Sequence, residues 1–156
     1  MPEDVDLTAY CGLYCRDCIP SHKELFAVTQ RLQELIQDLQ LDKYALVKAK
    51  QTYWSKANEV FSKYGDFSEF LQAIRELECK VTCREGGGYK GSDCEIRNCA
   101  LGKKLKGCWE CSKFKTCDLL APLEDFHPNL EYNLSLIKAN GVDHWAAQRK
   151  SHYRWG

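Results

Sequence analysis

Ten cysteines in two separate runs constrain the fold of this 156-residue chain more than any other feature of its sequence. No cysteine lies between Cys18 and Cys79. Thiols two to four residues apart can converge on one ion or cluster, because a tight turn directs neighbouring sulfurs to the same side. We therefore predict that all ten are metal ligands: Cys11, Cys15 and Cys18 in the first run, and Cys79, Cys83, Cys94, Cys99, Cys108, Cys111 and Cys117 in the second.

The composition favours a cytoplasmic protein. Residues 1–10 are acidic and lack the basic segment and apolar run of a secretory signal, and no stretch is apolar over the length that crosses a bilayer. In a reducing compartment, clustered cysteines are metal ligands more often than disulfides. An even cysteine count is the only support for a disulfide framework. We expect a cytoplasmic protein without a membrane span.

The balance of charge argues against a nucleic-acid partner. Lys and Arg together number 22, as do Asp and Glu, so the formal net charge is zero. A protein that binds nucleic acid over a large surface carries a basic excess. Lys103, Lys104 and Lys106 form a small basic patch beside Trp109, which we interpret as a solvated face.

Residues 21–78 show the periodicity of helices. Ser21 and Glu24 have the spacing of a capping box, and an apolar stripe follows them. A second stripe runs from Val47 to Tyr64 and ends at Gly65. Asp66 and Glu69 resemble another capping box before a third stripe. We predict a helical hairpin plus one helix whose core-packing stripes begin with Leu25, Val28, Leu32, Leu35 or Ile36, and Leu39, and end with Phe70, Ile74 and Leu77.

Residues 129–150 form the other predicted helical region. Leu130, Leu134 and Ile137 follow Asn129 at helical spacing, and Gly141 is placed to end the helix. The expected fold class is mainly α, with a helical hairpin and further helices around an irregular cysteine-rich lobe. We expect one domain over residues 1–156, with a helical part (21–78 and 129–150) and a metal-binding lobe (11–18 with 79–117).

Cysteine spacing also suggests how the ligands divide. Only Cys15–Cys18 and Cys108–Cys111 are two-residue knuckles, the spacing typical of tetrahedral zinc, so we predict that they share one site. A second site would use Cys79, Cys83, Cys94 and Cys99. Cys11 and Cys117 would then be buried thiols or complete an iron–sulfur arrangement. Zinc is the expected cofactor, and a [4Fe–4S] cluster is the alternative.

Catalytic readings of the same residues have less support. The C-x₃-C-x₂-C spacing from Cys11 to Cys18 also occurs in radical enzymes that use S-adenosylmethionine, but this chain is too short and too helical for their barrel. Cys15-Arg-Asp-Cys18 lacks the βαβ context of a redox dithiol. Among the histidines, only His22 has ligand spacing. No acid–base pair is recognisable, so we assign no catalytic residue and expect no independent enzymatic activity.

Three segments carry a resemblance to a known family. They are Tyr10-Cys-Gly-Leu-Tyr-Cys-Arg-Asp-Cys18, Cys94-Glu-Ile-Arg-Asn-Cys-Ala100 and Cys108-Trp-Glu-Cys-Ser-Lys-Phe-Lys-Thr-Cys117. Together they resemble the cysteine-rich prokaryotic family catalogued as domain of unknown function 3795. Gly91 stands where the family pattern has a further cysteine. The family implies no reaction.

The sequence therefore predicts a metal-binding protein. The leading hypothesis is structural zinc that supports a surface for a protein partner. The competing hypothesis is a small iron–sulfur protein for electron transfer or for assembly of a redox enzyme. The process, the partner and the oligomeric state are not encoded in any motif that we recognise.

Overall fold

The structure is a computed structural model that describes residues 3–53, 58–88 and 93–155. The prediction of a mainly helical fold is confirmed, and the described residues contain no strand, only one antiparallel bridge between Thr8 and Tyr14. Short 3-10 turns carry several of the cysteines. The described α-helices are α1 (Asp4–Leu7), α2 (Lys23–Asp38), α3 (Leu41–Ala49), α5 (Tyr64–Glu76), α6 (Glu95–Gly102) and α7 (Leu130–Asn140).

The chain divides into two compact units. The helical unit is His22–Glu78, and the cysteine unit combines Met1–Ser21 with Cys79–Gly156. All ten cysteines and α7 therefore belong to the cysteine unit. Residues 54–57 of the second predicted stripe, and Gly91, lie outside the described part of the chain.

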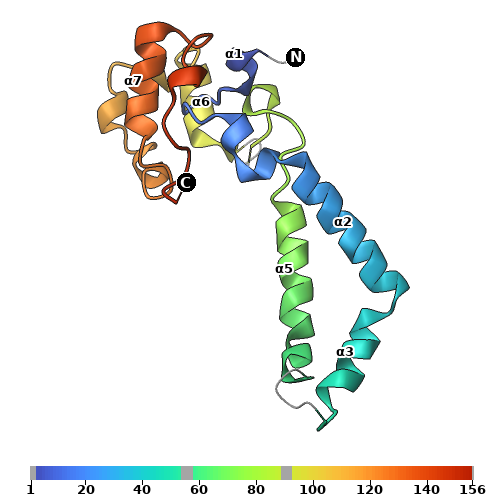
Figure 1. The fold of residues 1–156 in the computed structure, drawn as a ribbon. Coiled ribbons are helices and arrows are strands. Elements are labelled where there is room, and N and C mark those ends of the chain that lie inside the picture. Colours follow the sequence, from blue (N-terminus) through green and yellow to red (C-terminus); the bar gives the residue numbers. More distant parts are fainter. Residues whose placement is uncertain (1–2, 54–57, 89–92, 156) are drawn as a thin grey trace. The chain divides into compact units, whose positions relative to one another are not determined.

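In the helical unit, α2 and α5 lie side by side and run in opposite directions, with α3 in the connection between them (Figure 1). Arg75 donates to the Gln33 side chain at 3.2 Å, and Lys23 pairs with Glu78 at 3.4 Å. Both contacts join the two helices or the residues that flank them. A hairpin with one further helix agrees with the periodicity. The second predicted stripe, Val47 to Tyr64, is not one helix, however, because α3 ends at Ala49, residues 50–53 are not helical and Val60–Lys63 is a 3-10 turn.

Both predicted capping boxes of this unit are wrong. α2 begins after His22, and no side chain caps it. α5 begins at Tyr64, because the 3-10 turn Val60–Lys63 leads directly into it, so Gly65 lies within the helix. A helix that continues a preceding turn already has carbonyl partners for its first amides and needs no side-chain cap.

The buried face of α2 also differs from the predicted face. Most of the predicted stripe is exposed: Leu25, Val28, Leu32, Leu35 and Leu39 are 38, 60, 39, 39 and 73% exposed. Only Ile36, the predicted alternative to Leu35, is buried, together with Phe26 and Thr29 of the neighbouring row. The two rows lie one position apart on the helix, and α2 has apolar residues in both. Periodicity alone does not show which of two neighbouring apolar rows contacts the rest of the protein.

The core of the cysteine unit is built around α7. Leu134 and Ile137 of this helix are 1% exposed, and Trp145 is fully buried. Gly141 ends α7 as predicted, with φ of 84° and its amide bonded to the Ile137 carbonyl. Other members of the core come from both cysteine runs and from the segment that follows them: Leu7, Tyr14, Trp109, Phe114, Leu120, Leu130 and Ala146.

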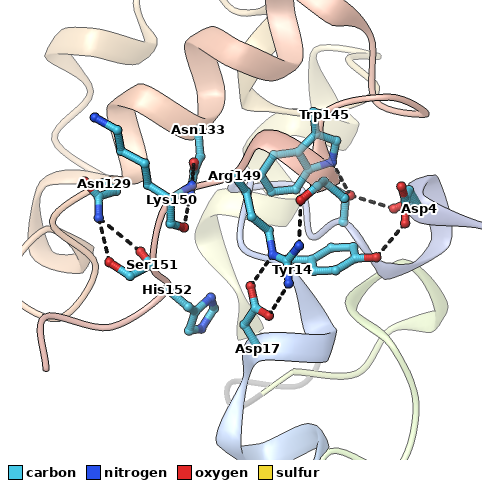
Figure 2. Close-up of polar contacts among 12 residues, drawn as sticks. Asp4, Tyr14, Asp17, Asn129, Asn133, Trp145, Arg149, Lys150, Ser151 and His152 are labelled. Atoms are coloured by element: carbon cyan, nitrogen blue, oxygen red, sulfur yellow. Dashed lines mark hydrogen bonds and ion pairs between the residues drawn. The ribbon is translucent and has the colours of Figure 1, made fainter. Parts of the chain in front are cut away.

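Polar contacts join the first cysteine run to the segment after α7 (Figure 2). The Trp145 indole donates to the Thr8 hydroxyl at 3.0 Å. Arg149 donates two hydrogen bonds to the Asp17 carboxylate, at 2.5 and 2.7 Å, and its guanidinium stacks over the Tyr14 ring. Paired bonds of this type fix direction as well as distance. They hold the turn of Cys15 and Cys18 in place.

Candidate metal centre

Backbone hydrogen bonds bring the two cysteine runs together. The Cys79 amide donates to the Pro20 carbonyl at 2.8 Å, and the Cys108 amide donates to the Tyr10 carbonyl at 2.7 Å. Arg84 adds two more bonds, to the Thr8 and Lys106 carbonyls. The sixty residues between the runs therefore do not keep their sulfurs apart.

Four thiols surround a small cavity of about 30 Å³. We call Cys99, Cys108, Cys111 and Cys117 the small thiol group. The remaining wall is mainly apolar and includes Ile96, Phe114 and Leu120. This volume is close to the space that one water molecule occupies in the liquid, so the cavity has room for one small species.

The environment of the small thiol group favours neutral thiols until a cation arrives. Burial, followed by the neighbouring thiols of Cys117, Cys99 and Cys111, raises the pKa of Cys108 to about 12. The Lys103 ammonium lies against Cys99, and this hydrogen bond with the sulfur raises the pKa of the exposed lysine. A metal ion would reverse the effect on the thiols, because metal-bound cysteine is deprotonated.

The other six cysteines line a larger cavity of about 430 Å³. They form the large thiol group: Cys11, Cys15, Cys18, Cys79, Cys83 and Cys94. The two groups adjoin, because Cys11 interacts electrostatically with Cys83, Cys108 and Cys94. The volume of this cavity falls within the range of small-molecule sites.

Hydrogen-bond donors are directed at the sulfurs of the first run. The Leu13 amide donates to Cys11, and the Cys83 amide donates to Cys15. Ser21 donates to Cys18 through its amide and its hydroxyl, and the Tyr153 hydroxyl lies 3.9 Å from the same sulfur. These bonds oppose the burial that raises the pKa of each thiol, to about 11 for Cys15. Donors of this kind stabilise the thiolate form.

Two carboxylates and two histidines also line the large cavity. Glu95 and Asp118 line the large cavity, and its described lining contains no Lys or Arg. His127 Nδ1 lies 2.6 Å from the His152 carbonyl, so this nitrogen is the donor. Burial, followed by the charge of His127, lowers the pKa of His152 to about 4, so its ring is neutral at pH 7.

The structure does not bring together the four cysteines predicted to share a site. The Cys15–Cys18 knuckle lines the large cavity with Cys79 and Cys83. The Cys108–Cys111 knuckle lines the small cavity. Of the predicted second set, Cys79, Cys83 and Cys94 stay together and Cys99 joins the small thiol group. The backbone bonds of Pro20 with Cys79 and of Tyr10 with Cys108 produce this division.

The histidines near the cysteines differ from the one whose spacing resembles that of a ligand. His22 flanks α2 in the helical unit, whereas His127 and His152 line the large cavity. These two rings are in edge contact, with centroids 4.6 Å apart. His127 lies before α7 and His152 after it, so their positions in the sequence show no ligand spacing, and only the fold brings them to the cysteines.

Two arginines and a tyrosine that position the thiols were also missed. The guanidinium of Arg97, which is 6% exposed, donates to the Cys83 and Gly87 carbonyls at 3.3 and 2.8 Å. Arg84 stacks between Tyr10 and Trp109, at 4.1 and 5.4 Å from the ring centres. Arg97 lies inside the Cys94–Cys99 motif, and this position could have indicated from the sequence that Arg97 belongs to the site. Tyr153 lies in no motif.

No three His, Cys, Asp or Glu side chains within residues 3–53, 58–88 and 93–155 stand together as a set ready to hold one ion. The thiols line cavities instead. In the same part of the chain, no helix has both the length and the apolar character needed to cross a membrane.

Comparison with known proteins identifies the family of this chain. A search among curated proteins and a search among solved structures found no match. The model of the family described as "Protein of unknown function (DUF3795)" matches residues 7–122, a range that contains all ten cysteines. The resemblance predicted from the three cysteine motifs is therefore confirmed, and the chain belongs to this family.

Proposed function

We propose that this is a metal-binding protein whose small thiol group holds a structural zinc ion and whose helical unit offers a surface to a protein partner. The observation that carries the first half is the lining of the small cavity. Four half-buried cysteines surround a space for one small species. Four thiolates and no open position are typical of a structural zinc site.

The position of this cavity explains why an ion there would stabilise the fold. Cys108, Cys111 and Cys117 pack against the core of the cysteine unit, beside Trp109 and Phe114. The segments that carry them are short 3-10 turns with few hydrogen bonds of their own. Bound zinc would hold Cys99, Cys108, Cys111 and Cys117 together. It would contribute folding free energy that such turns lack.

The exposed row of α2 supports the partner half of the proposal. Leu25, Val28, Leu32, Leu35 and Leu39 alternate at spacings of three and four, and each is at least 38% exposed. This is the spacing by which one helix packs along another in a coiled coil. The partner that fits this row is therefore an amphipathic helix of another protein.

Metal analysis and proteolysis test the zinc half. We expect the purified protein to contain zinc, and chelation to expose residues 99–117 to protease while the far-ultraviolet helical signal of α2 and α5 persists. Equal resistance of the metal-free protein over residues 99–117 would contradict a structural role. A protein without zinc after purification and after reconstitution would contradict the ligand assignment.

Two neighbouring substitutions test whether the exposed row of α2 is free to bind. Ile36→Ala should lower the free energy of unfolding by about 2–4 kcal/mol, because this side chain is 9% exposed. Leu35→Ala should cost less than about 1 kcal/mol, since that side chain is 39% exposed. Chemical denaturation measures both. Equal losses would mean that the exposed row is part of the fold.

A small iron–sulfur protein for electron transfer or redox-enzyme assembly is the second candidate. The donors to the sulfurs of Cys11, Cys15 and Cys18 favour it, because hydrogen bonds to cysteine sulfur set the reduction potential of a cluster. Anaerobic purification, a visible spectrum and sulfide analysis distinguish the candidates. A brown sample with iron and acid-labile sulfide would favour the cluster, and a colourless zinc protein would exclude it.

A further inference from the structure

We infer that the large thiol group binds a polynuclear metal centre, with more than one metal ion held by Cys11, Cys15, Cys18, Cys79, Cys83 and Cys94. The inference rests on the proposed function, because it takes the cysteines as metal ligands. It goes further by assigning one ion to the small cavity and several to the large one.

The first argument is the number of thiols around one continuous space. A four-coordinate ion uses four thiolates, so a single ion would leave two of the six without a ligand role. Two such ions that share two bridging thiolates use all six, as in binuclear zinc–cysteine modules. An iron–sulfur cluster would use four of the six thiolates as ligands, and the other two would remain beside the cluster.

Cavity size supports the same conclusion. The large cavity has a volume of about 430 Å³, against about 30 Å³ for the small one. The small cavity has room for one small species. A site for one ion of the same kind has no need of a space more than ten times larger, whereas several metal ions, with or without sulfide, occupy more room.

The residues that line the large cavity suit more than one cation. Glu95 and Asp118 share the wall with the six thiols, and no Lys or Arg is among the described lining residues. In contrast, Lys103 lines the small cavity. Bound metal ions would deprotonate the thiols and would then balance the charge of the thiolates and carboxylates. One divalent ion balances two negative charges.

Hydrogen-bond donors also face the three sulfurs of the first run. Amides of Leu13, Cys83 and Ser21 donate to Cys11, Cys15 and Cys18 in turn. The Tyr153 hydroxyl accepts from the Ile19 amide at 3.0 Å and is directed at Cys18. Each sulfur of the first run thus has a donor besides any metal. Such bonds orient ligands and tune the metal they hold.

Metal stoichiometry tests the inference. Reduced, metal-free protein is titrated anaerobically with Zn²⁺ and, separately, reconstituted with Fe²⁺ and sulfide, and native mass spectrometry counts the bound ions. We expect at least three zinc ions, or a cluster together with one further ion. The double variant Cys99→Ser/Cys111→Ser should lose one ion, and Cys15→Ser/Cys83→Ser should lose two or more. Each double variant is the control for the other.

The outcomes separate this inference from the proposed function. Two ions in all, with one lost in each double variant, would overturn the polynuclear centre and leave the small site intact. A wild-type protein that binds one ion in all, lost only in Cys99→Ser/Cys111→Ser, would likewise overturn the polynuclear centre and leave the small site intact. No metal at either group would overturn the proposed function as well. If Cys15→Ser/Cys83→Ser does not fold, X-ray absorption of the loaded wild-type protein decides. Metal–metal scattering supports the inference, and its absence overturns it.

Discussion

The two cavities of the cysteine unit use the same type of side chain but are assembled differently. The small thiol group, Cys99 to Cys117, comes from one stretch of 19 residues in the second cysteine run. The large thiol group combines residues 11–18 with residues 79–94, and its cavity is also lined by His127, His152 and Tyr153. The first can form from local turns, whereas the second requires the whole unit to fold.

This difference predicts how each site depends on the rest of the protein. The zinc site proposed for the small cavity would use all four of its thiols, so each would be indispensable. The large cavity has six thiols, several backbone donors and a wall of carboxylates and histidines. Loss of one thiol from the large cavity therefore removes a smaller part of that site. A change in the folding of the cysteine unit should disturb the large cavity before it disturbs the small one.

Loss of a small-group thiol should have the largest effect. Cys111→Ser is expected to release the bound zinc and lower the free energy of unfolding of the cysteine unit by more than about 4 kcal/mol, because structural metal binding is folding free energy. Cys79→Ser should cost less, since five thiols remain. Denaturation followed by the fluorescence of the buried Trp109 and Trp145, together with zinc analysis, measures both.

Ser112→Ala is the control for Cys111→Ser, because it changes the neighbouring side chain without removing a ligand. An equal loss in Cys79→Ser and Cys111→Ser would remove the distinction between the two cavities.

Gly12→Ala should have the next largest effect, through the attachment of the first cysteine run to α7. Gly12 has φ of 85°, and a Cβ atom there would lie 2.6 Å from Leu134 Cδ2. We expect a loss of about 3 kcal/mol in unfolding free energy, from a left-handed alanine and an overpacked core. Metal binding at the large cavity should be weakened more than metal binding at the small cavity.

Gly86→Ala is the matched control for Gly12→Ala. Gly86 also has a positive φ, of 93°, but no atom lies within 4 Å of its Cβ position. It should cost about 1 kcal/mol, the backbone strain alone. Equal losses of unfolding free energy in Gly12→Ala and Gly86→Ala would show that the contact with Leu134 does not contribute to the effect.

The sequence predicted helices better than it predicted contacts. Within the predicted helical regions 21–78 and 129–150, the structure has the helices Lys23–Asp38, Leu41–Ala49, Tyr64–Glu76 and Leu130–Asn140, and Gly141 ends the last of them, because periodicity and a glycine stop are local signals. The buried row of α2 was wrong by one position, and the two knuckles were paired wrongly. Both errors concern which partner a side chain meets in the folded chain.

Long-range backbone bonds determined the division of the cysteines, and no spacing rule contains them. The bond between Cys79 and Pro20 joins positions 59 residues apart, and the bond between Cys108 and Tyr10 joins positions 98 apart. The small thiol group needs neither bond to gather its own members. Its members are the last four cysteines of the given sequence. Grouping each cysteine with the cysteines nearest to it in the sequence would therefore have predicted this set.

Acid should distinguish the large cavity, because only it contains histidines. The folded-state pKa of His152 is about 4, below its ordinary value of 6.5, so the folded protein favours the neutral ring. Unfolding therefore takes up a proton at low pH, and the stabilisation present above pH 6.5 is lost as the pH falls towards 4. His152→Gln should remove up to about 2 kcal/mol of this pH dependence.

The comparison of variants isolates this effect from acid release of the metal, which occurs in all of them. His144→Gln is the control, since His144 is exposed and lines neither cavity. Denaturation of the metal-loaded proteins between pH 7 and 4 gives the three slopes. A His152→Gln profile parallel to that of the wild type would contradict the assignment of the acid response to this ring.

The smallest effect on stability should come from Tyr153→Phe, and it should be confined to the large cavity. The substitution removes a hydroxyl that accepts from the Ile19 amide at 3.0 Å and lies 3.9 Å from Cys18 Sγ, so we expect a loss of about 1 kcal/mol in unfolding free energy.

The absorption spectrum of the Co²⁺ form is the more sensitive readout of Tyr153→Phe. Without this donor, the Cys18 thiolate should give its electrons more readily to a bound metal, which shifts the sulfur-to-metal absorption of the Co²⁺ form to lower energy. Tyr132→Phe, at a residue that lines neither cavity, should leave both stability and spectrum unchanged. If Tyr153→Phe shifted absorption that survives in Cys15→Ser/Cys83→Ser, the hydroxyl would act on the small thiol group, and the separation of the two sites would be wrong.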